Sequence, residues 1–123
     1  MSEAAGAEQP FHGDDYCHLT TTGRRTGRPH RIEIWYAAEG NTLYLLAGGG
    51  RSSDWVRNLC ADPNVLVELG GDVRPGLARV VETGHEADTA RALVFGKYAP
   101  RYGGDLTAWR RSALPIAVDL ANS

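Results

Sequence analysis

The chain has 123 residues, of which 42% are hydrophobic and 23% charged, and its formal net charge is −2 at pH 7. This length indicates a single domain that buries roughly two thirds of the surface of the unfolded chain. The nearly balanced charge argues against a broad nucleic-acid-binding surface, and no apolar stretch of the sequence reaches the ~20 residues needed to cross a bilayer.

The N-terminal residues 1–13 contain neither a basic segment nor an apolar run, so we expect no signal peptide. Their Ala, Gly and Glu content predicts a short flexible leader, which leaves residues 14–123 as one domain. The two cysteines, Cys17 and Cys60, lie in different predicted elements without metal-binding or redox spacing. We therefore expect two buried free thiols and a cytoplasmic protein.

The first half of the chain predicts three strands. Residues 16–22 are rich in β-branched and aromatic side chains. Residues 30–38 alternate, with Trp35 on the polar face, and residues 42–47 are continuously apolar, which is typical of a strand buried on both faces. A short turn at residues 39–41 predicts a hairpin between these last two strands.

Three glycines at residues 48–50 end the third predicted strand. Ser52 or Ser53 can cap a helix that runs to about Cys60. The apolar stripe expected on this helix consists of Trp55, Val56, Leu59 and Cys60.

The second half predicts two more strands, at residues 64–69 and 73–82, in which Pro75 and Gly76 indicate a sheet edge or a bulge. A helix at residues 85–95, a short helix at residues 105–111 and a strand at residues 114–120 follow. Strands joined by hairpins, with few helices, favour an α+β protein built on a small antiparallel barrel or half-barrel.

The segment of residues 23–31, called the arginine loop below, contains four arginines and no acid in a chain that is acidic overall. Arginine binds phosphate and carboxylate through two parallel hydrogen bonds, and two glycines and a proline favour a fixed turn. The loop is therefore either an anion-binding site or a solvated turn that keeps a sheet edge soluble.

A second candidate for anion binding is the segment of residues 48–53, where glycines lead into a helix and Arg51 adds a positive charge. The alternative is a flexible connector. Both basic segments flank the predicted hairpin and could meet at one of its ends, which suggests a ligand with an acidic tail.

Aromatic residues supply a possible wall for a flat ligand. Trp35 lies on the polar face of its strand, where it is either an interface residue or part of a binding site. Tyr98 and Tyr102 fall in a glycine-containing segment, residues 97–104, which predicts a lid over a substrate or an ordered surface loop. The sequence has no GxSxG motif, no Walker loop and no zinc-ligand spacing, so no nucleophile and no metal site is expected.

Three segments together resemble the deazaflavin-dependent nitroreductase family. They are LTTTGRRTGRP at residues 19–29, SDWVRNL at residues 53–59 followed by ADPNV at residues 61–65, and Trp109 with LPI at residues 114–116. The resemblance implies a split β-barrel, related to the FMN-binding split barrels, with about six strands and two to three helices. It also implies that reduced coenzyme F420, which ends in a phosphate and an oligoglutamate tail, passes a hydride to a nitro compound, a quinone or an activated alkene.

The resemblance also assigns roles. Arg24 and Arg25 match positions that meet the anionic tail, and His30 matches an arginine near the phosphate. The remaining coenzyme contacts implied are Thr26, Arg28, Arg31, Gly48, Gly49, Gly50, Arg51 and Trp55. Trp35, Tyr98 and Tyr102 match the acceptor pocket. Apart from the resemblance, we expect a tyrosine, Glu33 or water to supply the proton that follows the hydride, and the alternative for Glu33 is a side chain that faces solvent.

The chain departs from the family at three places. His30 replaces the usual arginine, Arg51 is the nearest substitute for a lysine of the glycine loop, and Glu33 stands where the best-known members have an apolar residue. FMN is therefore a second choice of cofactor. The alternatives to an F420H2-dependent reductase are an FMN-dependent reductase and a non-catalytic carrier of a flavin-like, porphyrin-like or fatty-acid ligand; a nucleic-acid module is disfavoured, and a homodimer is plausible from the fold alone.

Overall fold

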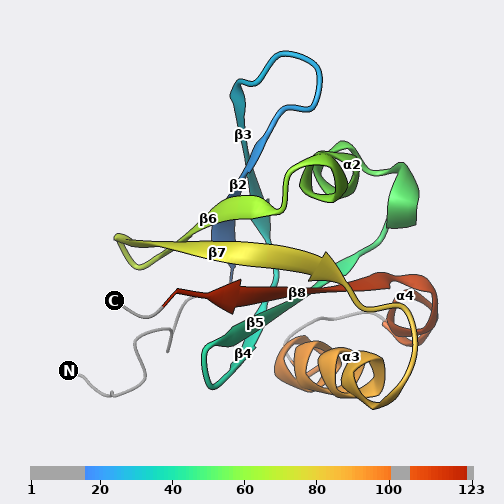
Figure 1. The fold of residues 1–123 in the computed structure, drawn as a ribbon. Coiled ribbons are helices and arrows are strands. Elements are labelled where there is room, and N and C mark those ends of the chain that lie inside the picture. Colours follow the sequence, from blue (N-terminus) through green and yellow to red (C-terminus); the bar gives the residue numbers. More distant parts are fainter. Residues whose placement is uncertain (1–15, 101–105, 122–123) are drawn as a thin grey trace.

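The computed structural model describes residues 16–100 and 106–121. The expected leader at residues 1–13 and the candidate residue Tyr102 lie outside this part of the chain. Within it, one antiparallel sheet of seven strands has the order β3-β2-β6-β7-β8-β5-β4 (Figure 1). The strands are β2 (Cys17–Thr22), β3 (Pro29–Ile34), β4 (Ala37–Glu39), β5 (Thr42–Ala47), β6 (Asn64–Leu69), β7 (Asp72–Val80) and β8 (Leu114–Leu120).

The connection between β3 and β4 closes the barrel. These strands lie at opposite edges of the sheet, yet only Trp35 and Tyr36 separate them along the chain. The sheet must therefore curl until its two edges approach each other, which produces the split barrel that the resemblance implies.

The prediction of one strand over residues 30–38 was wrong, because the chain leaves the sheet at Trp35 and Tyr36. The predicted hairpin is correspondingly limited to β4 and β5, whereas β3 pairs with β2 across the arginine loop. The remaining strand predictions are confirmed, and β8 has the predicted bounds.

The prediction of a sheet edge at Pro75 and Gly76 was also wrong, because β7 lies between β6 and β8. The Pro75 carbonyl accepts the amide of Ala121, so its nitrogen, which has no hydrogen, also faces the end of β8. A Cβ at Gly76 would lie 2.7 Å from Cγ1 of Val118, so this glycine makes room for a barrel side chain.

Three α-helices accompany the sheet in the described residues: α2 (Asp54–Ala61), α3 (His85–Tyr98) and α4 (Thr107–Ser112). A short 3-10 helix, η1 (Gly50–Ser52), precedes α2. Ser53 occupies the N-cap position of α2, as expected, but its side chain makes no capping hydrogen bond. Helix α3 is longer than the predicted 85–95 and includes Lys97 and Tyr98.

Two apolar clusters stabilise the fold. The first fills the barrel with alternate residues of its strands and with Val56 and Leu59 of α2. The second lies between α3, α4 and the outer face of β5 and β8, and includes Tyr44, Val94 and Tyr98. Because of this arrangement Cys17 is buried as expected, whereas Cys60 is exposed and its predicted burial was wrong.

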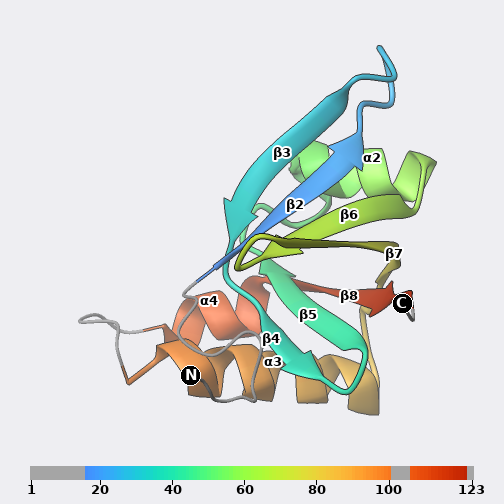
Figure 2. The same cartoon turned by 90° about the vertical axis from the view of Figure 1, so that its left-hand side faces the viewer.

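The two ends of the barrel carry different helices. Figures 1 and 2 show the β2–β3 hairpin projecting at one end with α2 beside it, and α3 with α4 at the other end, beneath β4 and β5. Strand β3 runs between these ends, from the arginine loop to the point where the barrel opens.

Candidate functional site

A pocket of about 570 Å³ opens where β3 leaves the sheet. Three of its lining residues, Glu33, Trp35 and Gly48, were predicted as site residues from the sequence. The others are Tyr16, Ile34, Leu46, Leu106 and Trp109. Three aromatic rings and one carboxylate therefore surround a space that suits a flat organic molecule.

Trp35 is held between two other aromatic rings. It stacks on Tyr98 with ring centroids 4.4 Å apart and planes 5° from parallel, and it meets Trp109 edge to face at 5.5 Å. A half-buried indole fixed in this way presents a rigid surface to the pocket.

Tyr98 lies neither in a lid nor in a surface loop, the two alternatives that the sequence left open. It lies in the last turn of α3 with a relative exposure of 2%. Its hydroxyl accepts a hydrogen bond from the amide of Tyr36 and donates one to the Tyr36 carbonyl, both at 3.1 Å. The prediction for Tyr98 was wrong because the glycines that suggest a loop come after this helical turn in the sequence.

Glu33 reaches the pocket from the exposed side of β3 and faces His18 of β2. Nε2 of His18 and Oε2 of Glu33 are 3.8 Å apart. Nothing in the sequence pattern pointed to a role for His18.

The arginine loop is anchored to α2 through Arg24. Its Nη1 donates to Oδ1 of Asn58 at 2.8 Å, its backbone N–H donates to the same oxygen at 3.2 Å, and Nη2 lies 3.3 Å from Asp54. Asn58 is 2% exposed and also donates to the hydroxyl of Thr21. Arg24 therefore fixes the loop, and its guanidinium is already occupied.

Two further cations of the predicted site have carboxylate partners. Arg31 pairs with Glu68 at 2.8 Å and Arg51 pairs with Glu82 at 2.8 Å. Within residues 16–100 and 106–121, the side chains of Arg25 and Arg28 have no such partner, and both are exposed.

Other predicted contacts lie close to this loop. The hydroxyl of Thr26 accepts the amide of Arg28 and shapes the turn. His30 is exposed and packs so closely over Gly23 that a Cβ there would lie 2.7 Å from its Nε2. Arg24 of the loop contacts Asp54, the first residue of α2, which directly follows residues 48–53.

Local geometry explains why two positions of the segment at residues 48–53 are glycines. Gly50 has a φ of 60°, which favours glycine, and a Cβ at Gly49 would lie 2.5 Å from Oγ of Ser53. Gly48 borders the pocket beside Trp109. Trp55, expected near the coenzyme, is half-buried and packs against the barrel core.

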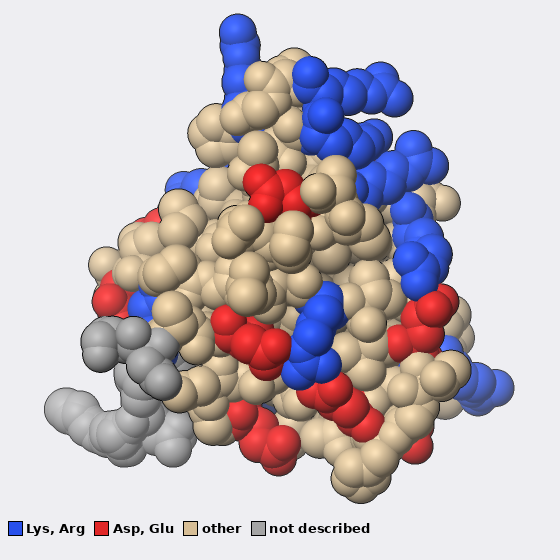
Figure 3. All heavy atoms as spheres, in the orientation of Figure 1, with Lys and Arg blue, Asp and Glu red and all other residues tan. Residues whose placement is uncertain are grey.

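Charge is distributed unevenly over the surface. Figure 3 shows Lys and Arg side chains gathered over the hairpin end and along α2, while acidic side chains lie mostly over the lower half. The arrangement can therefore hold a molecule with a flat ring at one end of β3 and an anionic group at the other.

Asn58 and Trp109 were missed as functional residues, although both stand within the motifs that carry the family resemblance. A polar residue on the buried stripe of a helix is the signal that indicates Asn58. Tyr16 gave no comparable signal, because its place in the pocket depends on how the sheet curls.

Among residues 16–100 and 106–121, no helix has the length and apolarity that a membrane span requires. No three His, Cys, Asp or Glu side chains in the same residues gather in a way that could hold a metal ion.

Comparisons with known proteins identify relatives along nearly the whole chain. A family model described as F420H(2)-dependent quinone reductase matches residues 1–121. The F420H(2)-dependent quinone reductases of two Mycobacterium tuberculosis strains, CDC 1551 and H37Rv, are each 34% identical over 89 residues, which cover 68% of this chain and 59% of the relative. The match therefore spans less than two thirds of the length of these curated relatives.

Solved structures share the fold at lower identity. A structure titled F420-H2 Dependent Reductase (FDR-A) is 23% identical with a TM-score of 0.71, covering 85% of this chain and 94% of that one. HutZ from Vibrio cholerae, titled a heme storage protein, is 15% identical with a TM-score of 0.68, covering 93% and 87%. Since the same barrel serves proteins with such different titles, these two likenesses bear on the fold alone.

Proposed function

Because the chain belongs to the F420H(2)-dependent quinone reductase family, we propose that it is a reductase that uses reduced coenzyme F420 to transfer a hydride to an electrophilic organic acceptor. A quinone is the first acceptor class to test, and nitro compounds and activated alkenes are the next. When bound, the coenzyme supplies the hydride, and the protein binds, orients and excludes water.

The observation that carries this proposal is the placement of two features along β3. The aromatic pocket lies at the Glu33 end, and the cations Arg25 and Arg28 lie at the other end. Glu33 is five residue steps from Arg28 along extended chain, which corresponds to roughly 16 Å. This spacing suits a ligand that joins a flat ring system to a phosphate and an acidic tail.

The residues present fit such a coenzyme. Arg25, Arg28 and His30 would bind the phosphate and tail, while Arg24 keeps the loop against α2. Arg31 and Arg51 contribute only if they exchange Glu68 and Glu82 for the ligand. The backbone at Gly48 would border the ring beside Trp109.

Trp35 and Trp109 would orient the acceptor, and Glu33 would meet the oxygen that becomes negative after the hydride arrives. In this proposal Tyr98 acts indirectly, because its hydroxyl is occupied by Tyr36 and its ring supports Trp35. A cytoplasmic location and a homodimer stay predictions; one solved structure 24% identical to the chain is titled a domain-swapped dimer.

Binding is the first experiment. The purified protein is titrated with oxidised F420 and, separately, with FMN, and tryptophan fluorescence is followed because two tryptophans line the pocket. The double substitution Arg25→Ala with Arg28→Ala is expected to weaken F420 binding at least tenfold, or about 1.4 kcal/mol. Arg74→Gln, which alters an arginine on β7 bonded to the Ala121 carbonyl, is the matched control.

Turnover is then measured anaerobically with reduced F420 and a water-soluble benzoquinone. Oxidation of the coenzyme that depends on both protein and quinone supports the proposal. Binding without turnover with any of the three acceptor classes indicates a carrier, and binding of FMN but not F420 would overturn the coenzyme assignment.

A further inference from the structure

His18 and Glu33 form a cross-strand pair beside the pocket. They stand directly opposite each other in the β2–β3 register, with Nε2 and Oε2 3.8 Å apart. Their side chains are 31% and 56% exposed, so both can exchange protons with solvent. The separation is within ion-pair range and longer than a hydrogen bond, and a small side-chain movement brings the atoms into contact.

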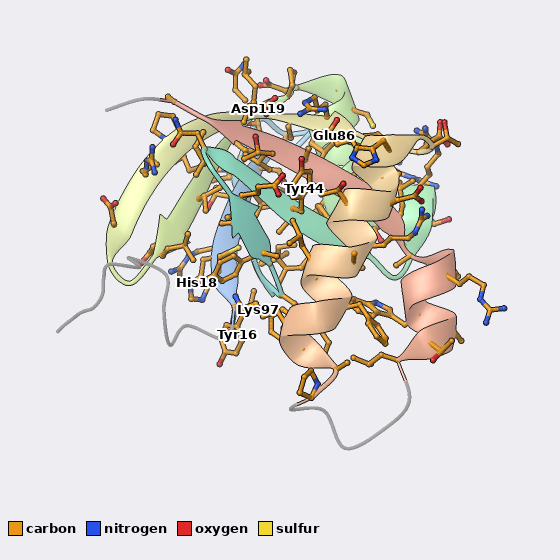
Figure 4. The ribbon with its side chains drawn as sticks, turned by 90° about the horizontal axis from the view of Figure 1, so that it is seen from below. Tyr16, His18, Tyr44, Glu86, Lys97 and Asp119 are labelled. Atoms are coloured by element: carbon orange, nitrogen blue, oxygen red, sulfur yellow. The ribbon has the colours of Figure 1, made fainter. Side chains whose placement is uncertain are left out.

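Only one member of this pair faces the acceptor. Glu33 lines the pocket, and so does Tyr16, whose ring meets the His18 imidazole edge to face at 6.5 Å. His18 contacts these two residues and is not part of the pocket lining. Figure 4 shows Tyr16 and His18 together at this end of the barrel.

The charged side chains next to the pair are already bound to each other. Glu68 of β6 stands opposite His18 on its other side, but its carboxylate is engaged by Arg31 of β3 at 2.8 Å. Among the described residues, Glu33 is the one that forms an ion pair with His18. The positive charge of protonated His18 is therefore balanced most directly by the Glu33 carboxylate.

The reduction of a quinone requires a proton from the protein or from water. A hydride brings one hydrogen with two electrons, which leaves a negative charge on an oxygen of the acceptor. The described pocket lining is otherwise apolar or aromatic, so Glu33 is its one carboxyl group. A carboxylate can pass a proton to the acceptor only when a second group supplies that proton, and the adjacent imidazole is His18.

We propose that His18 and Glu33 form a proton-donating pair for the acceptor, an inference that rests on the proposed reductase function. The His18 imidazolium N–H bond breaks as its proton passes to the Glu33 carboxylate, and the Glu33 O–H bond so formed breaks in turn as a new O–H bond forms on the acceptor oxygen. Glu33 is then a carboxylate again, and the neutral imidazole takes its next proton from the solvent. The electrons come from the reduced coenzyme, so no other reductant is required.

The first test is the pH dependence of kcat with a benzoquinone. In the wild type, kcat should fall as the pH is raised, because a deprotonated imidazole has no proton to pass to Glu33. Glu33→Gln should lower kcat about a hundredfold and His18→Gln about tenfold, and both should remove this pH dependence. Glu33→Asp should recover part of the rate, and His85→Gln, at the exposed start of α3, is the matched control.

A second test does not depend on turnover. 4-Nitrophenol is added without reduced coenzyme as a stand-in for the reduced acceptor, because its phenolate absorbs visible light and its phenol does not. Near neutral pH, binding to the wild type should reduce the phenolate band, because the pair donates a proton to the bound oxygen. His18→Gln and Glu33→Gln should bind the phenolate with the band retained.

These readouts separate the two proposals. If F420 binds and is oxidised but the variants keep the wild-type pH profile and the wild-type loss of the phenolate band, the proton-donating pair is wrong and the reductase stands. If wild-type protein neither binds nor oxidises reduced F420, the reductase proposal fails, whatever the nitrophenol result. Equal loss of F420 affinity in both variants and in His85→Gln would indicate a folding defect and overturn the proposed role.

Discussion

The hydroxyl of Tyr98 is hydrogen-bonded to both backbone polar groups of Tyr36, at 3.1 Å in each case. Tyr36 lies where the chain leaves the sheet between β3 and β4. Lys97 adds a hydrogen bond to the Tyr36 carbonyl at 3.0 Å and places its Nζ 3.4 Å from the centroid of the Tyr36 ring. The last turn of α3 therefore holds the opening of the barrel, where Trp35 lines the pocket.

Removal of the Tyr98 hydroxyl should destabilise the protein and leave the pocket shape largely intact. Tyr98→Phe removes two buried hydrogen bonds between its hydroxyl and the Tyr36 backbone, so we expect the free energy of unfolding to fall by about 1–3 kcal/mol. Urea denaturation measures this change. The ring that stacks on Trp35 remains, so the acceptor KM should change less than threefold, whereas Tyr98→Leu should raise it further.

The control is Tyr16→Phe, which removes a hydroxyl from a tyrosine that is 48% exposed. Its effect on the free energy of unfolding should stay within about 0.5 kcal/mol. Equal stability of Tyr98→Phe and the wild type would contradict the anchoring role.

The sequence predicts individual strands better than their partners. The alternation in β8 identifies its bounds and its buried face, because period-2 burial is a local property. The same pattern continues through Ile32, Ile34 and Tyr36, and Tyr36 is indeed buried, so nothing local marks the break in the strand. That break follows from curling of the whole sheet, which brings together residues far apart in the sequence.

The candidate site was likewise predicted only in part from the sequence. Charge composition identified the arginine loop, and Trp35 and Glu33 do line the pocket. The sequence could not predict that Arg24 anchors the loop while Arg25 and Arg28 stay exposed. This difference depends on Asn58 contacting Arg24 across 34 residues. The place of Tyr98 depended on where α3 ends, and helix ends are poorly defined by sequence.

Loss of the Asn58 amide should loosen the arginine loop. Asn58→Leu removes the acceptor of two Arg24 hydrogen bonds and the donor to Thr21, all at a buried position. We expect the free energy of unfolding to fall by about 2–3 kcal/mol and F420 affinity to fall about tenfold. Urea denaturation and fluorescence titration measure these effects separately.

Asn58→Asp is the informative companion variant, because it keeps an oxygen for Arg24 and loses only the donor to Thr21. It should retain most of the F420 affinity. If Asn58→Leu binds F420 as tightly as the wild type, the loop does not need this anchor.

The two thiols should differ sharply in reactivity. Burial raises the pKa of Cys17 to about 12, and a protonated thiol is a poor nucleophile. Cys60 is exposed on α2. Iodoacetamide should therefore label one site in the native protein and two after unfolding, as counted by mass spectrometry, and Cys60→Ser should leave no rapidly labelled thiol. Rapid native labelling of Cys17 would show that the barrel opens readily.

A cluster of charged groups fastens α3 to the barrel and should set the acid stability. Arg79 of β7 binds Glu86 of α3 at 2.7 and 2.8 Å and Asp119 of β8 at 2.7 Å, and the hydroxyl of Tyr44 donates to Glu86 at 2.9 Å (Figure 4). The Arg79 guanidinium lowers the pKa of Glu86 and of Asp119 below their ordinary values of 4.5 and 3.8.

A carboxyl group with a lowered pKa in the folded state stabilises the protein above its ordinary pKa, and this contribution is lost as the pH falls through the lowered value. Stability should therefore decline below about pH 4.5 as Glu86 and Asp119 become protonated. Arg79→Gln should lower the free energy of unfolding by on the order of 1 kcal/mol at pH 7 and flatten this acid decline. Arg51→Gln, which breaks a more exposed pair, is the control, and an equal effect of both variants would contradict the special role of the cluster.

At alkaline pH the sign is reversed for Tyr44. Burial, and then its hydrogen bond to Glu86, raise the pKa of Tyr44 to about 12, so its contribution is complete below its ordinary value of 10.0 and is lost as the pH rises through about 12. Tyr44→Phe should remove this alkaline decline, which circular dichroism follows between about pH 9 and about pH 12.

Trp109 should affect the acceptor more than the coenzyme tail. It meets Trp35 edge to face at 5.5 Å and lines the pocket, whereas Arg25 and Arg28 lie at the far end of β3. Trp109→Leu should raise the acceptor KM about tenfold, because one aromatic wall is lost and Trp35 becomes less restrained. Trp109→Phe, which keeps an aromatic edge, should recover most of this loss. F420 affinity should change less than threefold in either variant, and a tenfold loss of F420 affinity with an unchanged KM would instead assign this wall to the coenzyme ring.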